Sequence, residues 1–253
     1  MQFSSLGSGS KGNATLVRAG NTLVMIDCGF SLRETLRRMA RLGVSPEQLD
    51  AILVTHEHSD HCSGVAALSR KYHVPVYLTH GTLGSGRCEG SHEARCFNCD
   101  ESFEVGEIAV RAVAVPHDAA EPCQYVINWR QRSLGILTDL GSITPHVVEN
   151  FSACDGLVLE FNHDLPMLES GEYPPNLKRR VGGDWGHLNN NQAVELLRQL
   201  DHRGLSRLVV AHISEKNNRR ELAEAALLSL LDTLDGVIFA CQAEGFGWLD
   251  LPA

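Results

Sequence analysis

The sequence of 253 residues lacks any apolar run that approaches the ~20 residues needed to cross a bilayer. Residues 1–7 also lack the basic and apolar stretches of a secretory signal peptide. We therefore expect a cytoplasmic protein with no transmembrane helix and no membrane partner. In a reducing cytosol, most of the eight scattered cysteines should be free thiols.

Three further features are missing. Basic residues are not in excess, and the formal net charge of −9 argues against broad electrostatic binding to nucleic acid, although not against a local basic groove. No second Cys-x-x-Cys accompanies Cys96 and Cys99, so a separate zinc site is not favoured. The Gly/Ser segment 7–13 lacks the Walker spacing and its terminal Lys-Ser/Thr. It is interpreted as a flexible loop between strands near the mouth of a site.

The chain is long enough, with 43% hydrophobic residues, for one large domain or two small ones. No linker separates two cores, so we expect one domain over residues 1–253. Strands are predicted at 13–18, 21–27, 51–54, 76–78, 108–115, 124–129, 133–138, 156–159, 207–211, 236–240 and 245–249. Helices are predicted at 31–42, 63–72 and 219–233, with another that ends at Leu200, whereas 80–103 is expected to be the least regular part and 165–186 a loop-rich insertion.

The densest group of potential ligands directly follows the apolar run 51–54. It reads Thr55-His56-Glu57-His58-Ser59-Asp60-His61. Packing needs none of these imidazoles and carboxylates, whereas zinc, manganese and iron bind both kinds of group. On an extended loop His56 and His58 would point the same way. The alternative, a polar loop in which Asp60 caps the next helix, is disfavoured because His-x-His-x-Asp-His follows a buried strand.

Five predicted strands end at or near a candidate ligand. In chain order these are His56, His117, Asp139, His163 and His212. Sites in layered α/β proteins form at one edge of the sheet, so groups that are distant in sequence can converge there. A single His at a strand end is more often a hydrogen-bonded surface residue. Five such ends, together with residues 56–61, favour a shared site.

The motif His56-x-His58-x-Asp60-His61 resembles the signature of the metallo-β-lactamase-fold superfamily of metallohydrolases. The resemblance extends from Ser4 to about Asp250. It looks closest to the small bacterial VicX/YycJ-type subgroup, through Ser8-Gly9-Ser10-Lys11-Gly12-Asn13, Pro116-His117-Asp118, Glu160-Phe161-Asn162-His163-Asp164 and Gly186-His187-Leu188. It implies an α/β fold, the four-layer αββα sandwich. Members of the subgroup are regarded as DNA 5′-to-3′ exonucleases or related hydrolases.

The same resemblance implies two divalent metal ions, zinc or manganese, with iron as a further option. One ion is implied to bind His56, His58 and His117, the other Asp60, His61 and His212, with Asp139 bridging. The implied catalytic residues are Asp60, Asp139 and His187. His187 resembles an additional His of transfer-RNA 3′-processing members and is a candidate to protonate the leaving group or to hold the phosphate. Packing at the start of a helix is the alternative role for His187.

The predicted reaction is attack of hydroxide on phosphorus, in line with the leaving oxygen. Two divalent ions outweigh the charges of Asp60 and Asp139, so the site favours an anionic substrate and stabilises charge that builds on phosphoryl oxygens. We expect Glu57 to orient neighbouring residues rather than to bind metal. Asp27 and Asp118 are weaker candidates for such a supporting role. His163 and Asp164 are equally compatible with a supporting, a substrate-binding or a purely structural role.

Three functions remain open at this point. The first is a phosphodiesterase or nuclease with DNA as its substrate, for which the basic clusters at 178–180 and 216–220 could bind phosphates, although they are equally compatible with solvated loops. The second is hydrolysis of a small ester, lactone, thioester or cyclic phosphodiester, favoured by the charge of −9 and the lack of a long clamp insertion. The third is a non-catalytic binding protein, which the full ligand set disfavours. Protein partners and oligomeric state are not predicted.

Overall fold

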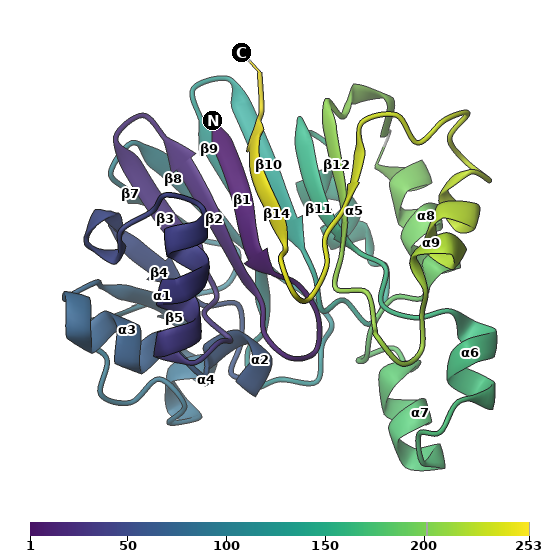
Figure 1. Ribbon diagram of the computed structural model, residues 1–253, viewed down its shortest axis with the longest axis horizontal. Coiled ribbons are helices and arrows are strands. Elements are labelled where there is room, and N and C mark those ends of the chain that lie inside the picture. Colours follow the sequence, from purple (N-terminus) through teal and green to yellow (C-terminus); the bar gives the residue numbers. More distant parts are fainter. Residues whose placement is uncertain (201, 253) are drawn as a thin grey trace.

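Two β-sheets packed face to face make up the centre of the molecule. The structure, a computed structural model, describes residues 1–200 and 202–252. Within them, each sheet has seven strands (Figure 1). The first sheet consists of β14 (Phe246–Asp250), β1 (Gln2–Gly7), β2 (Ala14–Ala19), β3 (Thr22–Ile26), β4 (Ala51–Leu53), β5 (Val76–Thr79) and β6 (Ala94–Phe97), in spatial order. The second consists of β13 (Val237–Phe239), β12 (Arg207–Ala211), β11 (Gly156–Glu160), β10 (Arg132–Leu137), β9 (Cys123–Trp129), β8 (Ile108–Ala114) and β7 (Ser102–Val105).

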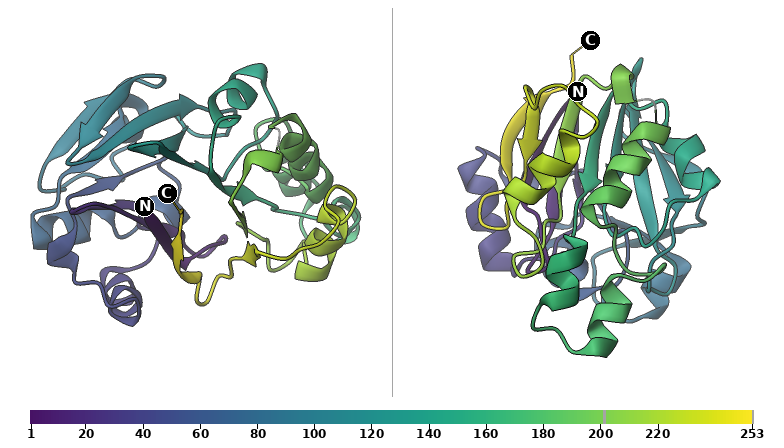
Figure 2. Two further views of the ribbon diagram at one scale, coloured as in Figure 1. Left: turned by 90° about the horizontal axis from the view of Figure 1, so that it is seen from above. Right: turned by 90° about the vertical axis from the view of Figure 1, so that its right-hand side faces the viewer.

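Helices cover the outer faces of both sheets. On the first sheet these are α1 (Leu32–Arg41) and α3 (Val65–Tyr72), and on the second α5 (Pro145–Phe151), α8 (Asn190–Gln199) and α9 (Arg220–Leu227) (Figure 2). One apolar cluster fills the space between the sheets, and one lies beneath the helices on each side. Tyr125 and Phe3 are completely buried between the sheets, whereas Met39 and Leu197 fix α1 and α8 to their outer faces. The expected αββα sandwich is therefore confirmed.

The order of strand directions brings the ends of several strands to one edge. β10, β11 and β12 run parallel, and β8 runs the same way because both β8 and β10 pair antiparallel with β9. In the other sheet β3, β4 and β5 are also parallel. β4 and β11 are buried at every position, which matches their continuous apolar runs. Their carboxyl ends point to the lower edge of the sandwich in Figure 1.

Several predictions about regular structure were wrong. Residues 80–103 are not irregular, because they contain α4 (His80–Gly84), β6 and the beginning of β7. Residues 165–186 contain two short helices, α6 (Leu165–Ser170) and α7 (Pro175–Val181), each with a proline in its first turn. The last helix ends at Leu227 rather than at 233. The strand β1 was not predicted at all.

The sequence predicted that the loop after β4 leads into a single helix, but the structure has two helices there. A short helix, α2 (Ser59–Cys62), precedes α3 and carries Asp60 and His61. His58 is the residue before its first turn, so Asp60 lies inside the helix and does not cap it.

All eight cysteines are free thiols. Within the described residues, no helix is both long enough and apolar enough to cross a membrane.

Candidate metal centre

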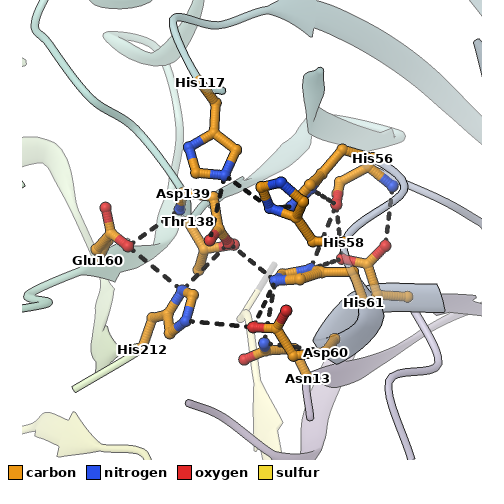
Figure 3. A network of polar contacts seen from close by, with 12 residues as sticks. Asn13, His56, His58, Asp60, His61, His117, Thr138, Asp139, Glu160 and His212 are labelled. Carbon is orange, nitrogen blue, oxygen red and sulfur yellow. Dashed lines mark hydrogen bonds and ion pairs between the residues drawn. The ribbon is translucent and has the colours of Figure 1, made fainter. Parts of the chain in front are cut away.

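Side chains from both sheets meet at the lower edge of the sandwich. His56 follows β4, His117 follows β8, Asp139 follows β10 and His212 follows β12. Figure 3 shows these residues pointing toward one another, together with His58, Asp60 and His61 from the loop and helix after β4. Among the described residues, they form overlapping groups whose ligand atoms lie within 4.8 Å of one another.

Three imidazole nitrogens form one such group. His58 Nδ1 lies 3.0 Å from His56 Nε2 and 3.2 Å from His117 Nε2. Three nitrogens at these distances cannot all be satisfied by hydrogen bonds to one another, because each hydrogen bond needs one donor and one acceptor. Tetrahedral zinc ligands at about 2.0–2.1 Å from the ion lie about 3.4 Å apart. The spacing of the three nitrogens is therefore close to that of a metal site.

Hydrogen bonds on the far side of two rings favour the matching tautomers. His117 Nδ1 lies 3.0 Å from the carbonyl oxygen of Gly186, which can only accept, so Nδ1 carries the proton and Nε2 keeps a free lone pair. His56 Nδ1 lies 2.9 Å from Thr55 Oγ1. Such partners orient imidazole ligands in metal sites. Burial lowers the pKa of His117 and, together with the charge of His61, lowers the pKa of His56 well below the ordinary value. Both rings are therefore neutral and able to donate a lone pair.

A second group lies beside the first and shares Asp139 with it. Asp60 Oδ2 lies 3.6 Å from His61 Nε2 and 3.9 Å from His212 Nε2. Asp139 Oδ2 lies 3.1 Å from His61 Nε2, while its Oδ1 lies 3.9 Å from His117 Nε2. Asp139 thus faces both groups, one with each carboxylate oxygen.

Two buried polar atoms of the second group lack the hydrogen bonds they require. His212 Nδ1 and Asp139 Oδ2 are fully buried and make no hydrogen bond, although they lie only 3.1 Å apart. Buried polar atoms of proteins almost always have a partner. Nitrogen and carboxylate oxygen ligands at this density are also the donor set of divalent zinc and manganese. The residues present therefore fit a bound divalent metal.

Asp27 connects Thr55, the residue before His56, to His61 of the second group. Its carboxylate accepts from the Thr55 backbone nitrogen and hydroxyl, each at 2.8 Å, and its Oδ2 lies 2.8 Å from His61 Nδ1. His61 is thereby oriented with Nε2 toward Asp139, as a carboxylate orients imidazoles in metal sites. The supporting role predicted for Asp27 matches these contacts.

Three residues of the site have left-handed backbone conformations. These are Asp27, Asp139 and His212, with φ of 60°, 53° and 52°. Such values are uncommon outside glycine, and they cluster where the surrounding structure must fix a side chain in place. Here they turn the chain at three strand ends so that carboxylate and imidazole point into the site.

The charges of the site favour an ionised Asp139. Burial alone would raise the pKa of this carboxyl group, but His212 and His61 hold it well below the ordinary value. Burial opposes protonation of His61, whereas Asp139, Asp27 and Asp60 raise the pKa of this ring well above 6.5. The carboxylates thus attract positive charge to this point, either as ring protons or as a metal ion, which compete for the same nitrogen atoms.

Glu160, at the end of β11, is the residue that sequence reasoning missed. The side chain is completely buried and accepts from three backbone N–H groups, those of Asp139, Leu140 and Leu188. Glu160 Oε1 also lies 2.9 Å from His187 Nδ1. The sequence contained a signal, because a carboxylate that ends a buried strand needs several donors, but it did not show where those donors would come from.

His187 lies at the open side of the centre. Burial lowers the pKa of His187, but the carboxylate of Glu160, with Asp139 and Asp60, raises it to about 9. The ring is therefore protonated at neutral pH. Since Nδ1 binds Glu160, the Nε2–H group is the proton available to a bound molecule.

Other predicted candidates lie around the centre. Glu57 accepts from the Ala120 backbone and belongs to none of the ligand groups, in agreement with the prediction. Asp118 pairs with Arg180 and lies 3.8 Å from His58 Nε2. Asp164 caps α6. His163, one of the candidate groups near a strand end, is buried outside all four ligand groups, and Glu160 is the residue of β11 that reaches the centre.

The Gly/Ser segment 7–13 contacts the centre. The Ser8 hydroxyl accepts from the His212 backbone nitrogen at 2.9 Å. The Asn13 backbone nitrogen donates to the Asp60 carbonyl at 2.8 Å, and its side-chain amide lies 3.1 Å from His61 Nε2. This segment therefore joins the two sheets at the site rather than binding phosphates in the manner of a Walker loop.

A pocket of about 520 Å³ opens above the ligands. It is lined by Ser10, Glu57, His58, Ser59, Asp60, Arg87, Asp118, Asp139, Leu177, Arg180, Val181, Gly186, His187 and His212. Its volume is in the range that binds a single small ligand. Its lining includes two arginines, Arg87 from the loop before β6 and Arg180 from α7, and Arg180 pairs with Asp118.

Comparison with known proteins identifies the family. The profile described as "Beta-lactamase superfamily domain" matches residues 22–213. The chain is 33% identical to Exodeoxyribonuclease WalJ of Streptococcus pneumoniae, covering 92% of this chain and 89% of that protein. It is 34% identical to Exodeoxyribonuclease YycJ of Bacillus anthracis, with the same two coverages.

Solved structures agree on the fold. The metallo-β-lactamase fold protein YhfI from Bacillus subtilis superimposes with a TM-score of 0.75 at 15% identity, covering 98% of this chain and 99% of that one. Zn²⁺-bound PqqB from Methylobacterium extorquens gives a TM-score of 0.75 at 16% identity, covering 99% and 100%. The fold implies binding of a divalent metal. The chain therefore belongs to the beta-lactamase superfamily, as a metallo-β-lactamase-fold protein of the YycJ type.

Proposed function

We propose that this protein is a metal-dependent phosphodiesterase that degrades DNA as a 5′-to-3′ exonuclease. The observation that carries the proposal is the pair of ligand groups joined by Asp139 beneath a pocket with two arginines. The similarity over most of the chain to proteins named exodeoxyribonuclease supports the DNA substrate. We also propose that residues 1–253 form one domain, because strands from both halves share the core between the sheets, and that it acts in the cytoplasm.

The proposed centre holds two divalent ions, zinc or manganese. His56, His58 and His117 would hold one ion, and Asp60, His61 and His212 the other, while Asp139 would bridge them. When bound, the ions polarise the phosphoryl oxygens and make hydroxide available from water near neutral pH. Asp27 and Glu160 keep the ligands and His187 in place through the hydrogen bonds described above.

The protein side chains supply binding and proton transfer. Arg87 and Arg180 bind the phosphates that flank the scissile bond, as guanidinium groups suit phosphate oxygens. His187 donates its Nε2 proton to the leaving 3′-oxygen of deoxyribose. Glu160 acts as its positioning residue, since the carboxylate fixes the ring through Nδ1 and favours the protonated state. A positioned general acid contributes about 10²- to 10⁴-fold to the rate.

One observation favours a second function, the hydrolysis of a small ester, lactone, thioester or cyclic phosphodiester. The net charge of −9 repels a polyanion at long range far more than a small substrate that is neutral or carries a single negative charge. Such a substrate would bind in the same pocket and use the same centre.

The test uses metal-stripped protein, to which Mn²⁺ or Zn²⁺ is added with DNA duplexes labelled at the 5′ or the 3′ end. We expect metal-restored release of mononucleotides from the 5′ end. Cleavage of neither strand with any metal, in a protein that still hydrolyses a lactone or a small phosphodiester, would favour the second function.

The leaving group separates the proposed role of His187 from a structural one. His187→Ala should lower kcat on DNA by about 10²-fold or more, because the alkoxide that leaves needs a proton. A p-nitrophenyl phosphodiester, whose leaving group is stable without a proton, should lose much less. His80→Ala, at an exposed position of α4, is the matched control and should affect neither substrate. Equal losses on both substrates would contradict the role as an acid.

A further inference from the structure

Apolar side chains of α7 face the pocket without belonging to the protein core. Leu177 and Val181 lie four residues apart, which places them on the same side of the helix. Both line the pocket beside Arg180. Both are half-buried, yet neither belongs to any of the apolar clusters found among the described residues. Their exposed surface is therefore available to a bound molecule.

Trp185 is an exposed aromatic residue that directly precedes Gly186 in the chain. Its side chain is 64% exposed and is the most exposed of the large apolar residues described. Its backbone packs closely against another segment, because a Cβ at Gly141, two residues after Asp139, would lie 2.6 Å from the Trp185 Cα atom. The next residue, Gly186, lines the pocket and accepts from His117. The indole is thus exposed one residue from the lining of the pocket, and an exposed aromatic ring offers a face on which a base can stack.

Positive charges accompany this surface. Arg87 lines the pocket from the loop before β6, and Arg180 from α7, where Lys178 and Arg179 precede it. Figure 1 shows α6 and α7 projecting below the second sheet, while α4, which leads into the loop of Arg87, lies below the first. A ligand that spans the pocket meets the apolar side chains and Arg180 on the α7 side and Arg87 on the opposite side. Such a ligand is anionic and carries a flat apolar group, which describes a nucleotide.

The size of the pocket limits how a nucleotide can enter. A volume of about 520 Å³ suits one small ligand and is too small for a base-paired duplex end. A terminal nucleotide must therefore leave its stack before its phosphodiester reaches the metal ligands. Enzymes that act on bases solve the same problem by unstacking the nucleotide and stacking it on protein side chains.

We propose that Leu177, Val181 and Trp185, here called the α7 strip, bind the unpaired base and deoxyribose of the terminal nucleotide, while Arg87 and Arg180 hold its phosphates. The proposal rests on the proposed exonuclease function and adds a determinant of substrate choice to it. It assigns the helical insertion 165–186 as a substrate-binding element. Ends that fray or are already single-stranded are then the preferred substrates.

The test compares two DNA ends that differ only in the base of the terminal nucleotide, one normal and one abasic. Metal-loaded wild-type protein should cleave the normal end with a kcat/KM about tenfold higher, the size expected for one stacked base. Leu177→Ala and Trp185→Ala should each reduce this ratio toward one. Leu165→Ala, at a 42% exposed leucine of α6 that does not line the pocket, is the matched control and should keep the wild-type ratio.

The outcomes separate this proposal from the function on which it rests. Ratios in Leu177→Ala and Trp185→Ala equal to the wild-type ratio would overturn the role of the α7 strip and leave the exonuclease function intact. An increased KM for a long-chain lactone in these variants, without a change on DNA, would assign the strip to an acyl chain instead. If wild-type protein hydrolyses methyl p-nitrophenyl phosphate but no DNA end, the exonuclease function itself fails.

Discussion

Asp139 is the residue on which the proposed centre depends most. It is the carboxylate that faces both ligand groups, and His61 and His212 hold it ionised at the bottom of the pocket. A side chain in this position would affect both proposed metal ions at once, whereas each histidine would hold one. The loss of Asp139 should therefore be more severe than the loss of a single imidazole.

Asp139→Ala tests this directly. We expect the variant to bind less than half of the wild-type metal and to lose about 10³-fold or more in turnover, because the ions supply both charge stabilisation and hydroxide. Metal content measured by atomic emission beside the rate on DNA gives both quantities. Asp232→Ala, an exposed aspartate outside the site, is the control. Full metal content and turnover in Asp139→Ala would refute the arrangement of ligands proposed above.

His163 is a buried imidazole that remains uncharged in the folded protein. The ring is fully buried, and neither of its nitrogens makes a hydrogen bond. Burial, partly opposed by the charge of Glu160, lowers the pKa of His163 to about 4 from 6.5. The folded protein thus keeps His163 neutral over a range in which the unfolded chain binds a proton.

The consequence is a loss of stability in acid. Between pH 6.5 and pH 4 the unfolded state binds one more proton at this position, so the free energy of unfolding falls as pH is lowered, by about 3 kcal/mol in total. His163→Phe should be less dependent on pH in this window, as measured by urea unfolding at a series of pH values. His80→Phe, on the exposed side of α4, should retain the wild-type slope. An unchanged slope in His163→Phe would show that the ring is not the group responsible.

Contact between backbone segments positions α2, the short helix that carries Asp60 and His61. Gly29, just after β3, lies so close that an added Cβ would overlap the carbonyl group of Asp60. The backbone nitrogen of Cys28 also donates to the His61 carbonyl at 2.7 Å. The absence of a side chain at Gly29 is therefore what allows α2 to bring both ligands to the centre.

Gly29→Ala should separate these segments. We expect a loss of about 1–3 kcal/mol in the free energy of unfolding, as for other overpacked positions, and weaker metal binding because Asp60 and His61 move together. Thermal unfolding and a metal titration measure the two effects. Gly84→Ala, at the end of α4 where a Cβ meets nothing within 4 Å, is the matched control and should not destabilise the protein. Metal affinity equal to the wild-type value in Gly29→Ala would contradict the role of this contact.

The strands that are buried on both faces were the easiest to predict from the sequence. β11 and β12 are continuous apolar runs, and the ligand types that follow such runs are rare enough to mark the site. β1 escaped prediction because Ser4 and Ser5 occupy buried positions, where Ser5 Oγ donates to the Ala14 carbonyl at 3.2 Å. Its place in the sheet depends on partners elsewhere in the chain, which no local pattern reveals.

The role of Glu160 could not be predicted for a related reason. Its partners come from residues 139–140 and 187–188, two segments far apart in the sequence that only the fold brings together. The helices α6 and α7 were missed because their prolines and glycines resemble a loop, although proline is well tolerated in the first turn of a helix. The pattern thus identified the proposed metal ligands but not the elements that are proposed to contact the substrate.

The charge of the whole molecule sets how the proposed substrate approaches. A protein of net charge −9 repels DNA except near the proposed metal ions and the cations of the pocket and of α7. Those cations are Arg87, Lys178, Arg179 and Arg180, and the last of them already pairs with Asp118. The number of phosphates that protein side chains can neutralise is therefore small.

Binding of single-stranded DNA should accordingly depend only moderately on salt. If about two to four phosphates are neutralised, the slope of log K against log salt concentration is about −1.5 to −3 for a single strand. Fluorescence anisotropy with metal-stripped wild-type protein, in which the proposed reaction lacks its metal ions, measures this slope for the protein side chains alone, and Arg87→Gln should make it shallower by about 0.7. A slope near zero would favour a small neutral substrate. A slope steeper than about −6 would contradict this small number of contacts, because it would require many more phosphates to be neutralised.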